Sequence, residues 1–154
     1  MLSVTYTAAL SGLEGYIVTV ECSGQRNLPD LDIVGLPDMA VREARQRVKA
    51  AAESCGIPFP DMELVVNLAP ANLRKSGTHF DLSILISLLT ANGTIKNSRF
   101  KDVFLGELSL DGSIRRVSGV LPMSIAAKKN GVQRIFVPEE NAAEATLAHG
   151  PAII

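Results

Sequence analysis

The side chains best suited to chemistry lie in and just after a polar loop at residues 70–78, which precedes an apolar segment. Two serines, Ser76 and Ser83, and one histidine, His79, occur there. A serine becomes a nucleophile when a neighbouring base accepts its proton. Neither serine has an evident base at helical spacing, so we interpret Ser76 as turn chemistry and Ser83 as a small residue in a crowded helix. A lone histidine beside a helix start is more often a capping or solvent-facing residue than a catalyst.

Nucleotide, metal and disulfide chemistry have less support. Nucleotide hydrolysis requires a GxxxxGK[ST] loop, and the nearest fragment, residues 74–77, lacks the glycine that should precede Lys75. The two cysteines, Cys22 and Cys55, form no CxxC pair, which predicts neither a zinc site nor a disulfide framework. We therefore expect this chain to bind no cofactor and no metal.

Composition restricts the class of partner. The 154 residues include 15 Lys and Arg against 16 Asp and Glu, a net charge of −1, whereas dedicated nucleic-acid-binding proteins usually have a basic excess. Aromatic residues make up 5% of the chain and tryptophan is absent, so a stacking platform for single strands is poorly supplied. No apolar run approaches the roughly 18 residues of a membrane span. These features, with no secretory signal, predict a cytoplasmic protein without membrane contact.

Basic side chains nevertheless form two local groups. One follows a face of a predicted helix: Arg42, Arg45 and Lys49. The other lies in loops or turns: Arg74, Lys75, Arg115 and Arg116. The charges of Glu43 and Glu53 balance those of the helical group, so we favour a solvated face for this side of the helix. Arg47 lies nearer the flank of that face. All seven remain candidate DNA-backbone contacts, whose affinity would fall with salt, and we expect weak or absent DNA binding by the isolated domain.

Strand patterns dominate the first third of the chain. The extended runs are residues 3–10, 15–20 and 31–36. A helix is predicted over 39–54, with Asp38 as its N-terminal cap and Gly56 at its end. Residues 62–68 form the next strand, and their run Leu64-Val65-Val66 predicts burial on both faces.

The remaining elements alternate. Residues 80–89 are apolar almost all round, which places this helix at the centre of the core. The other predicted elements are a strand at 102–110 with a hairpin turn at Asp111-Gly112, a helix at 118–129, a strand at 133–137, a helix at 139–148 and a strand at 151–154. Several strands before the first helix predict an α+β fold with a mixed sheet packed with helices, rather than a doubly wound sheet. The length predicts one domain.

Several long motifs, in order along nearly the whole chain, carry a family resemblance. They are residues 33–38, 41–43, 67–77, 80–82 and 106–112. This sequence resembles the N-terminal domain of the ComM/YifB family of magnesium-chelatase-like AAA+ ATPases. The resemblance implies a ribosomal protein S5 domain 2-like fold, similar to the proteolytic domain of Lon and to a domain of the recombination protein RadA.

The same resemblance implies which residues occupy the positions of the Lon peptidase dyad. Lon-type peptidases use a serine nucleophile and a lysine base. Their serine position corresponds to His79 here, and their lysine position corresponds to Leu121. A leucine cannot accept a proton, so the resemblance implies a pseudoprotease with no catalytic residues of its own.

Partners and cofactors are also implied by resemblance. Residues 1–154 would be a single Lon-like domain, the N-terminal part of a longer AAA+ protein that binds ATP and Mg²⁺ elsewhere in its chain. That parent would be a DNA branch-migration helicase in natural transformation, working as a homo-oligomer such as a hexameric ring. The domain would then act in assembly, with the rest of its chain as partner, or in DNA guidance. A DNA-backbone-binding module and a cryptic hydrolase with a non-Lon nucleophile stay open as alternatives.

Overall fold

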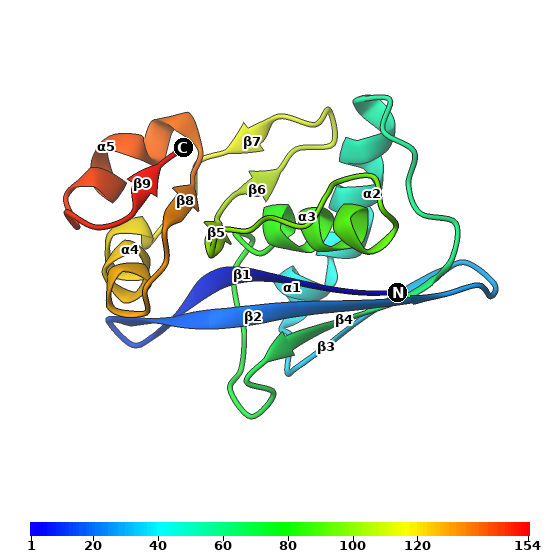
Figure 1. The fold of residues 1–154 in the computed structure, drawn as a ribbon, viewed down its shortest axis with the longest axis horizontal. Helices are drawn as coiled ribbons and strands as arrows, with labels where there is room; N and C mark the ends of the chain where they lie inside the picture. The colour runs from blue at the N-terminus through cyan, green and yellow to red at the C-terminus, as the bar shows by residue number, and fades with distance from the viewer.

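Seven strands form one mixed sheet in the order β3-β4-β2-β1-β5-β8-β9, in a computed structural model that describes all 154 residues (Figure 1). The strands are β1 (Leu2–Ser11), β2 (Glu14–Gln25), β3 (Asp30–Val34), β4 (Glu63–Ala69), β5 (Asp102–Phe104), β8 (Arg134–Phe136) and β9 (Ala152–Ile153). β2 runs antiparallel to β1 and β4, and the other neighbours are parallel. The α+β class and the mixed sheet predicted from the sequence are confirmed.

The two longest strands, β1 and β2, form a ribbon shared by two hydrophobic cores. The ribbon pairs from Leu2–Ser23 to Ser11–Glu14. Successive side chains of a strand point to opposite faces. Accordingly, Ala8 belongs to a core with α4 (Val120–Lys129), whereas Ala9 belongs to a core with α2 (Ala44–Ser54) and α3 (Asp81–Ala91). The two cores therefore lie on opposite faces of the ribbon.

The first helical segment is interrupted, which the sequence did not predict. In place of one helix over 39–54, α1 (Met39–Arg42) and α2 are separated at Glu43, whose ψ is −14°. At this bend the Arg47 Nη2 donates to the carbonyl oxygen of Ala40 at 2.7 Å. The predicted cap is confirmed, because the Asp38 carboxylate accepts from the Val41 amide at 2.9 Å.

The prediction that Leu64-Val65-Val66 is buried on both faces is wrong. Leu64 and Val66 are buried, whereas the Val65 residue between them is 38% exposed. One face of β4 packs into the core of α2 and α3, and the opposite face is open to solvent. Only one of the two faces of this apolar run is therefore buried.

Helix α3 lies in the core as predicted. Eight of its 11 residues are buried, among them Ser83 and Ser87. Their hydroxyls donate to the carbonyls of Phe80 and Ile84 at 2.9 and 2.7 Å, so these polar groups are satisfied within the helix. Serine can therefore occupy a crowded apolar helix without an unpaired buried hydroxyl.

The strand predicted over 102–110 is divided. β5 ends at Phe104, and the chain forms a separate two-stranded sheet, β6 (Glu107–Leu108) with β7 (Ile114–Arg115). At the break, the Gly106 amide donates to the His79 carbonyl at 3.2 Å and the Gly106 carbonyl accepts from the Leu82 amide at 3.1 Å. A Cβ on Gly106 would meet the Ile114 side chain at 2.7 Å, so a larger residue here would have to displace that side chain.

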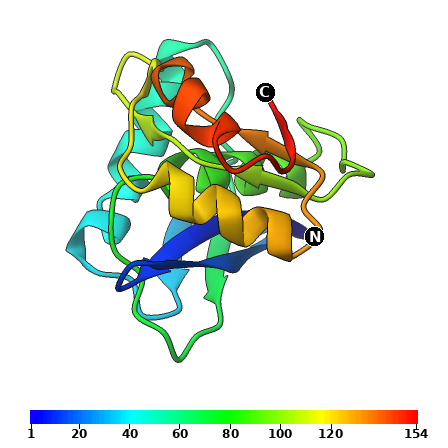
Figure 2. The ribbon, with the colours of Figure 1, turned by 90° about the vertical axis from the view of Figure 1, so that its left-hand side faces the viewer.

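The C-terminal part covers the opposite face of the ribbon from α3. α4 lies across β1 and β2, and the 3₁₀ turn η1 (Glu139–Asn141), α5 (Ala142–Thr146) and β9 follow β8 (Figure 2). The predicted elements at 118–129, 133–137, 139–148 and 151–154 are all present with shorter bounds. None of the helices has both the length and the apolar character that crossing a lipid bilayer requires.

Candidate functional site

The loop before α3 and the segment before α4 enclose a small cavity of about 340 Å³. It is lined by Leu10, residues 76–79 and residues 117–118. Three hydroxyl side chains are among these residues, from Ser76, Thr78 and Ser118, but no lysine is. The structure therefore brings His79 close to serines from two different segments and supplies no amine beside them.

His79 is held as a buried, neutral imidazole. The residue is 8% exposed, and its Nε2 lies 2.7 Å from the carbonyl oxygen of Ala8. A carbonyl only accepts, so Nε2 carries the proton. Burial lowers the pKa of His79, although the bond to Ala8 and the charge of Asp38 act in the opposite direction. This histidine is neither the cap nor the solvent-facing residue that we expected, because it connects the start of α3 to β1.

Leu121 lies apart from that cavity, in the first turn of α4. It is half-buried, and its backbone amide donates to the Glu144 Oε1 at 3.2 Å. Its side chain is hydrocarbon and is not among the cavity residues. Leu121 therefore offers no titratable group, and none of the hydrogen bonds of the structure joins His79 to a serine hydroxyl.

Lys75 is the one lysine that is fully buried, which the sequence did not indicate. Its Nζ donates to the Gly35 carbonyl at 2.9 Å and also to the Pro70 carbonyl. Burial lowers the pKa of Lys75. Since its partners are backbone carbonyls and not a hydroxyl, this ammonium fastens two loops together instead of activating a nucleophile. Its burial also removes Lys75 from the surface that a DNA backbone could reach in this conformation.

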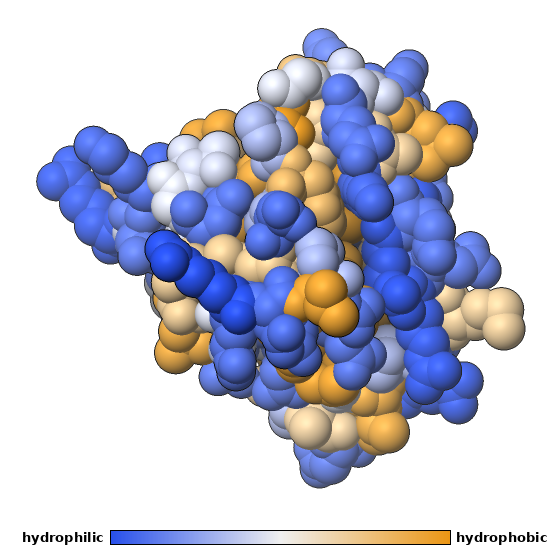
Figure 3. All heavy atoms as spheres, turned by 90° about the vertical axis from the view of Figure 1, so that its right-hand side faces the viewer, coloured by the Kyte–Doolittle hydropathy of each residue, from blue (hydrophilic) through white to orange (hydrophobic).

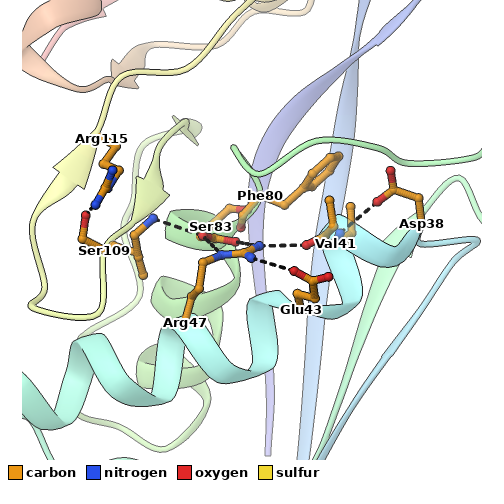
Figure 4. Close-up of polar contacts among 11 residues, drawn as sticks. Asp38, Val41, Glu43, Arg47, Phe80, Ser83, Ser109 and Arg115 are labelled. Atoms are coloured by element: carbon orange, nitrogen blue, oxygen red, sulfur yellow. Dashed lines mark hydrogen bonds and ion pairs between the residues drawn. The ribbon is translucent and has the colours of Figure 1, made fainter.

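A buried ion pair lies beside this region, between Arg47 of α2, which is labelled in Figure 4, and Asp81 of α3. The Arg47 Nε and Nη2 donate to the two Asp81 oxygens at 2.7 and 3.0 Å, and the Leu108 amide donates to Oδ2 at 3.1 Å. The hydrogen bond to Asp81 raises the pKa of Arg47. The clue in the sequence was the single carboxylate in an otherwise apolar helix, but its partner could not be read from spacing.

The helical stripe faces acidic as well as basic neighbours. Arg45 and Lys49 line a cavity of about 510 Å³ together with Asp30, Glu53 and Asp61. These five groups carry a net charge of −1. The end of the molecule seen in Figure 3 bears mostly hydrophilic side chains with small apolar patches between them. The third member, Arg42, lies with Arg45 beside a neighbouring cavity that also contains Asp32. This distribution of charge favours the solvated-face interpretation.

The loop arginines are exposed but occupy separate places. Arg74 lies in the loop before α3, whereas Arg115 and Arg116 belong to the β6–β7 hairpin and the segment that follows it. The Arg115 Nε donates to the Ser109 hydroxyl, which fixes this side chain along the hairpin (Figure 4). Arg74 and Arg116 have no such contact among the hydrogen bonds of the structure, so both remain available to a ligand.

The sequence analysis missed a group of side chains around β5 and β8. Asp102 is buried and accepts from the Nε and Nη2 of Arg134 at 2.7 and 2.6 Å. Arg134 in turn lies over the rings of Phe100 and Phe136. The pattern Lys96-x-x-Arg99-Phe100-Lys101 could have pointed to this group, but the low aromatic content concealed it.

Comparison with known proteins places the chain in a family. Residues 20–141 match the family described as subunit ChlI of Mg-chelatase. The chain is 37% identical over 147 residues to the competence protein ComM of Haemophilus influenzae and 38% identical over 150 residues to the uncharacterized protein YifB of Escherichia coli. These matches cover 95% and 97% of the chain but only 29% of each relative.

Other relatives agree with this placement. An uncharacterized protein of Mycobacterium tuberculosis is 41% identical over 150 residues, which are 97% of the chain and 30% of that protein. A Lon protease of the Aster yellows witches'-broom phytoplasma is 28% identical over 134 residues, which are 82% of the chain and 17% of the protease. The chain therefore spans less than a third of the relatives it matches. It belongs to the magnesium-chelatase ChlI-subunit family, alongside ComM and YifB, and is related more distantly to Lon protease.

Proposed function

We propose that residues 1–154 form a single non-catalytic module of a ComM/YifB-type AAA+ ATPase, with the ribosomal protein S5 domain 2-like fold of the Lon proteolytic domain. The parent protein would be a cytoplasmic DNA branch-migration helicase in natural transformation. ATP and Mg²⁺ would be bound outside these residues. The module would assist assembly of a homo-oligomeric ring or guide DNA toward the motor.

One observation carries the non-catalytic part of the proposal. The positions that the family resemblance equates with the Lon dyad are His79, whose Nε2 hydrogen is donated to the Ala8 carbonyl, and Leu121, which has no titratable group. The only fully buried ammonium nearby, that of Lys75, is bonded to backbone carbonyls. A serine–lysine mechanism needs the amine to accept the proton of the serine hydroxyl. No lysine lines the cavity that contains His79, Ser76 and Ser118.

Labelling with a fluorophosphonate tests this part directly, because the reagent reacts with activated serines. We expect no adduct on the purified chain, and mass spectrometry of Ser76→Ala and Ser118→Ala variants provides the matched background. A stoichiometric adduct on either serine, lost in the corresponding variant, would establish the cryptic hydrolase instead.

The assembly role has a separate test. Sedimentation velocity at rising concentration should reveal reversible self-association of the chain, since a module that spaces subunits needs contacts between copies. A sedimentation coefficient that does not change with concentration would transfer the assembly role to the rest of the parent protein. The labelling result would be unaffected.

The second candidate is contact with a DNA backbone through Arg74, Arg115 and Arg116. Their exposure and the absence of an ion pair at any of the three favour it. Fluorescence anisotropy with duplex DNA at low salt should show at most weak binding by the isolated chain, and replacement of the three arginines with glutamine should abolish what is seen. Submicromolar affinity for the duplex would make this candidate the leading function.

A further inference from the structure

The connection between α3 and β5 carries a cluster of cations and aromatic rings that the function proposed above does not use. This connection projects from the body of the molecule beside β8, in light green in Figure 2. Its exposed part includes Lys96, Arg99 and Phe100. Although aromatic residues are scarce in the chain, four of the seven Phe and Tyr residues lie in or beside the cluster: Tyr6, Phe100, Phe104 and Phe136.

The planar groups of this cluster form a continuous ladder. The guanidinium carbon of Arg99 lies 5.4 Å from the centroid of the Phe100 ring, and that of Arg134 lies 4.3 Å from the same centroid. Arg134 also lies 5.4 Å from the Phe136 centroid. The ladder ends at Phe104, whose ring stacks on that of Phe136 at 4.6 Å with an interplanar angle of 20°. Cross-strand pairing of β5 with β8 fixes the last members in register.

The net charge of the cluster is positive. Its one carboxylate, that of Asp102, is paired with Arg134, so this pair contributes no net charge. Lys96, Arg99 and Lys101 are left without an acidic partner among the ion pairs of the structure. The Lys101 Nζ lies 5.3 Å from the centroid of the Tyr6 ring, which brings a third strand, β1, into the cluster.

Part of this cluster lines a cavity of about 330 Å³: Tyr6, Lys96, Arg99, Phe100, Lys101 and Phe104. Arg134 and Phe136 lie outside the lining and continue the ladder beyond it. That volume is at the lower end of the range for ligand pockets, about 300–1,000 Å³. Flat rings and guanidinium groups stack on bases of any sequence, and the neighbouring cations can neutralise phosphates. Stacking also requires bases that are not paired in a duplex.

We propose that this cavity binds single-stranded nucleic acid and holds one nucleotide of the strand, with its base against Arg99 and Phe100 at the exposed part of the ladder. Lys96, Arg99 and Lys101 would contact the adjoining phosphates. The proposal deepens the DNA-guidance role proposed above and rests on it for its biological setting. It uses a different surface from the loop arginines, so the two can fail independently.

The absence of tryptophan gives a direct probe of stacking. Phe100→Trp keeps a large ring in the exposed part of the ladder and makes it the only tryptophan of the chain. Oligothymidylate added at low salt should quench its fluorescence, and the titration should saturate. A duplex of equal length should quench it much less. The mononucleotide dTMP, added as a competitor, should displace the strand only weakly, because it offers a single phosphate.

Substitutions should separate stacking from charge in an anisotropy titration with labelled oligothymidylate. Phe100→Ala should weaken binding at least about fivefold with no change in its salt dependence. Combined Lys96→Gln, Arg99→Gln and Lys101→Gln should weaken it at least about tenfold and reduce the slope of log affinity against log salt by about 2. Lys128→Gln with Lys129→Gln, at the exposed end of α4, is the matched control and should have little effect.

Three results would overturn the proposal. The first is equal affinity for duplex and single-stranded DNA. The second is unaltered binding by a Phe100→Ala variant whose far-ultraviolet circular dichroism spectrum is native. The third is displacement of the labelled strand by polyaspartate as effectively as by unlabelled oligothymidylate. The last would assign the cluster to an acidic peptide. Loss of binding on replacement of Arg74, Arg115 and Arg116 alone would instead support the loop arginines and reject this cavity.

Discussion

Arg47 and Asp81 lie 34 residues apart in sequence, yet two of the arginine nitrogens meet both carboxylate oxygens, at 2.7 and 3.0 Å. The pair connects α2 to α3, and the amide of Leu108 adds β6 to the same carboxylate. Three elements of the chain therefore converge on one buried charge, whose side chain is fully inaccessible to solvent.

Removal of either partner should destabilise the fold strongly. We expect Arg47→Met to reduce the free energy of unfolding by about 3–5 kcal/mol, because it leaves a buried carboxylate uncompensated. Urea denaturation measures the change, and Arg45→Met, at an exposed position of the same helix, should stay within about 0.5 kcal/mol of the native chain. Arg47→Met combined with Asp81→Leu should recover much of the loss. Additive single effects would show that the two groups are not coupled.

Lys75 should matter for stability and not for nucleic-acid binding. Lys75→Met leaves the carbonyls of Gly35 and Pro70 without their donor, which should cost about 1–3 kcal/mol of unfolding free energy. Arg74→Met, at the exposed neighbouring position, is the control and should leave stability nearly unchanged. Any affinity for DNA should be the same in the Lys75→Met variant as in the native chain. A drop in affinity without a drop in stability would show that Lys75 leaves its buried position.

Burial of His79 should make the fold less stable in mild acid. Because the pKa of His79 is lowered, the unfolded chain takes up a proton near pH 6.5 that the folded chain does not, so unfolding is favoured as the pH falls below that value. His79→Gln keeps a side-chain donor but removes the titration, and its urea midpoint should decline less between about pH 7 and 5. Equal declines would mean that His79 is protonated as readily in the folded state.

Asp102 should change stability in the same direction as His79, but over a lower range of pH. Burial raises the pKa of Asp102, but the hydrogen bonds from Arg134 and Ser98 and the charge of Arg134 together bring it below its ordinary value. Its contribution to stability is therefore complete above pH 3.8, the ordinary carboxyl value, and is lost as the pH falls through the folded-state value. The difference in urea midpoint between the native chain and Asp102→Asn should narrow over that range. A constant difference would assign the effect of the substitution to packing alone.

Regular elements could be predicted because their residues repeat with the period of the structure. The largely apolar sequence of α3 indicated its place in the core, and the carboxylate of Asp38 indicated the start of α1. The exposure of Val65 was not predictable in this way, since a continuous apolar run does not say whether a second layer covers the sheet. The division of residues 102–110 depends on contacts of Gly106 with His79 and Leu82, which lie elsewhere in the sequence.

Charged and aromatic groups were the least predictable part of the candidate site. Lys75 reads as one member of a basic loop, and only the folded positions of two distant carbonyls explain its burial. Arg134 and Phe100 meet because β8 lies beside β5, although 33 residues separate them in the chain. The chain has few Phe and Tyr residues, but the fold brings most of their rings together in this cluster.

The placement of Ala8 and Ala9 in different cores bears on how this molecule melts. Both cores pack against the same β1–β2 ribbon, so we expect that neither core can unfold on heating while the other stays folded. Differential scanning calorimetry should then record a single endotherm whose calorimetric and van't Hoff enthalpies agree. The hairpin of β1 and β2 would thus couple the unfolding of the two halves of the molecule.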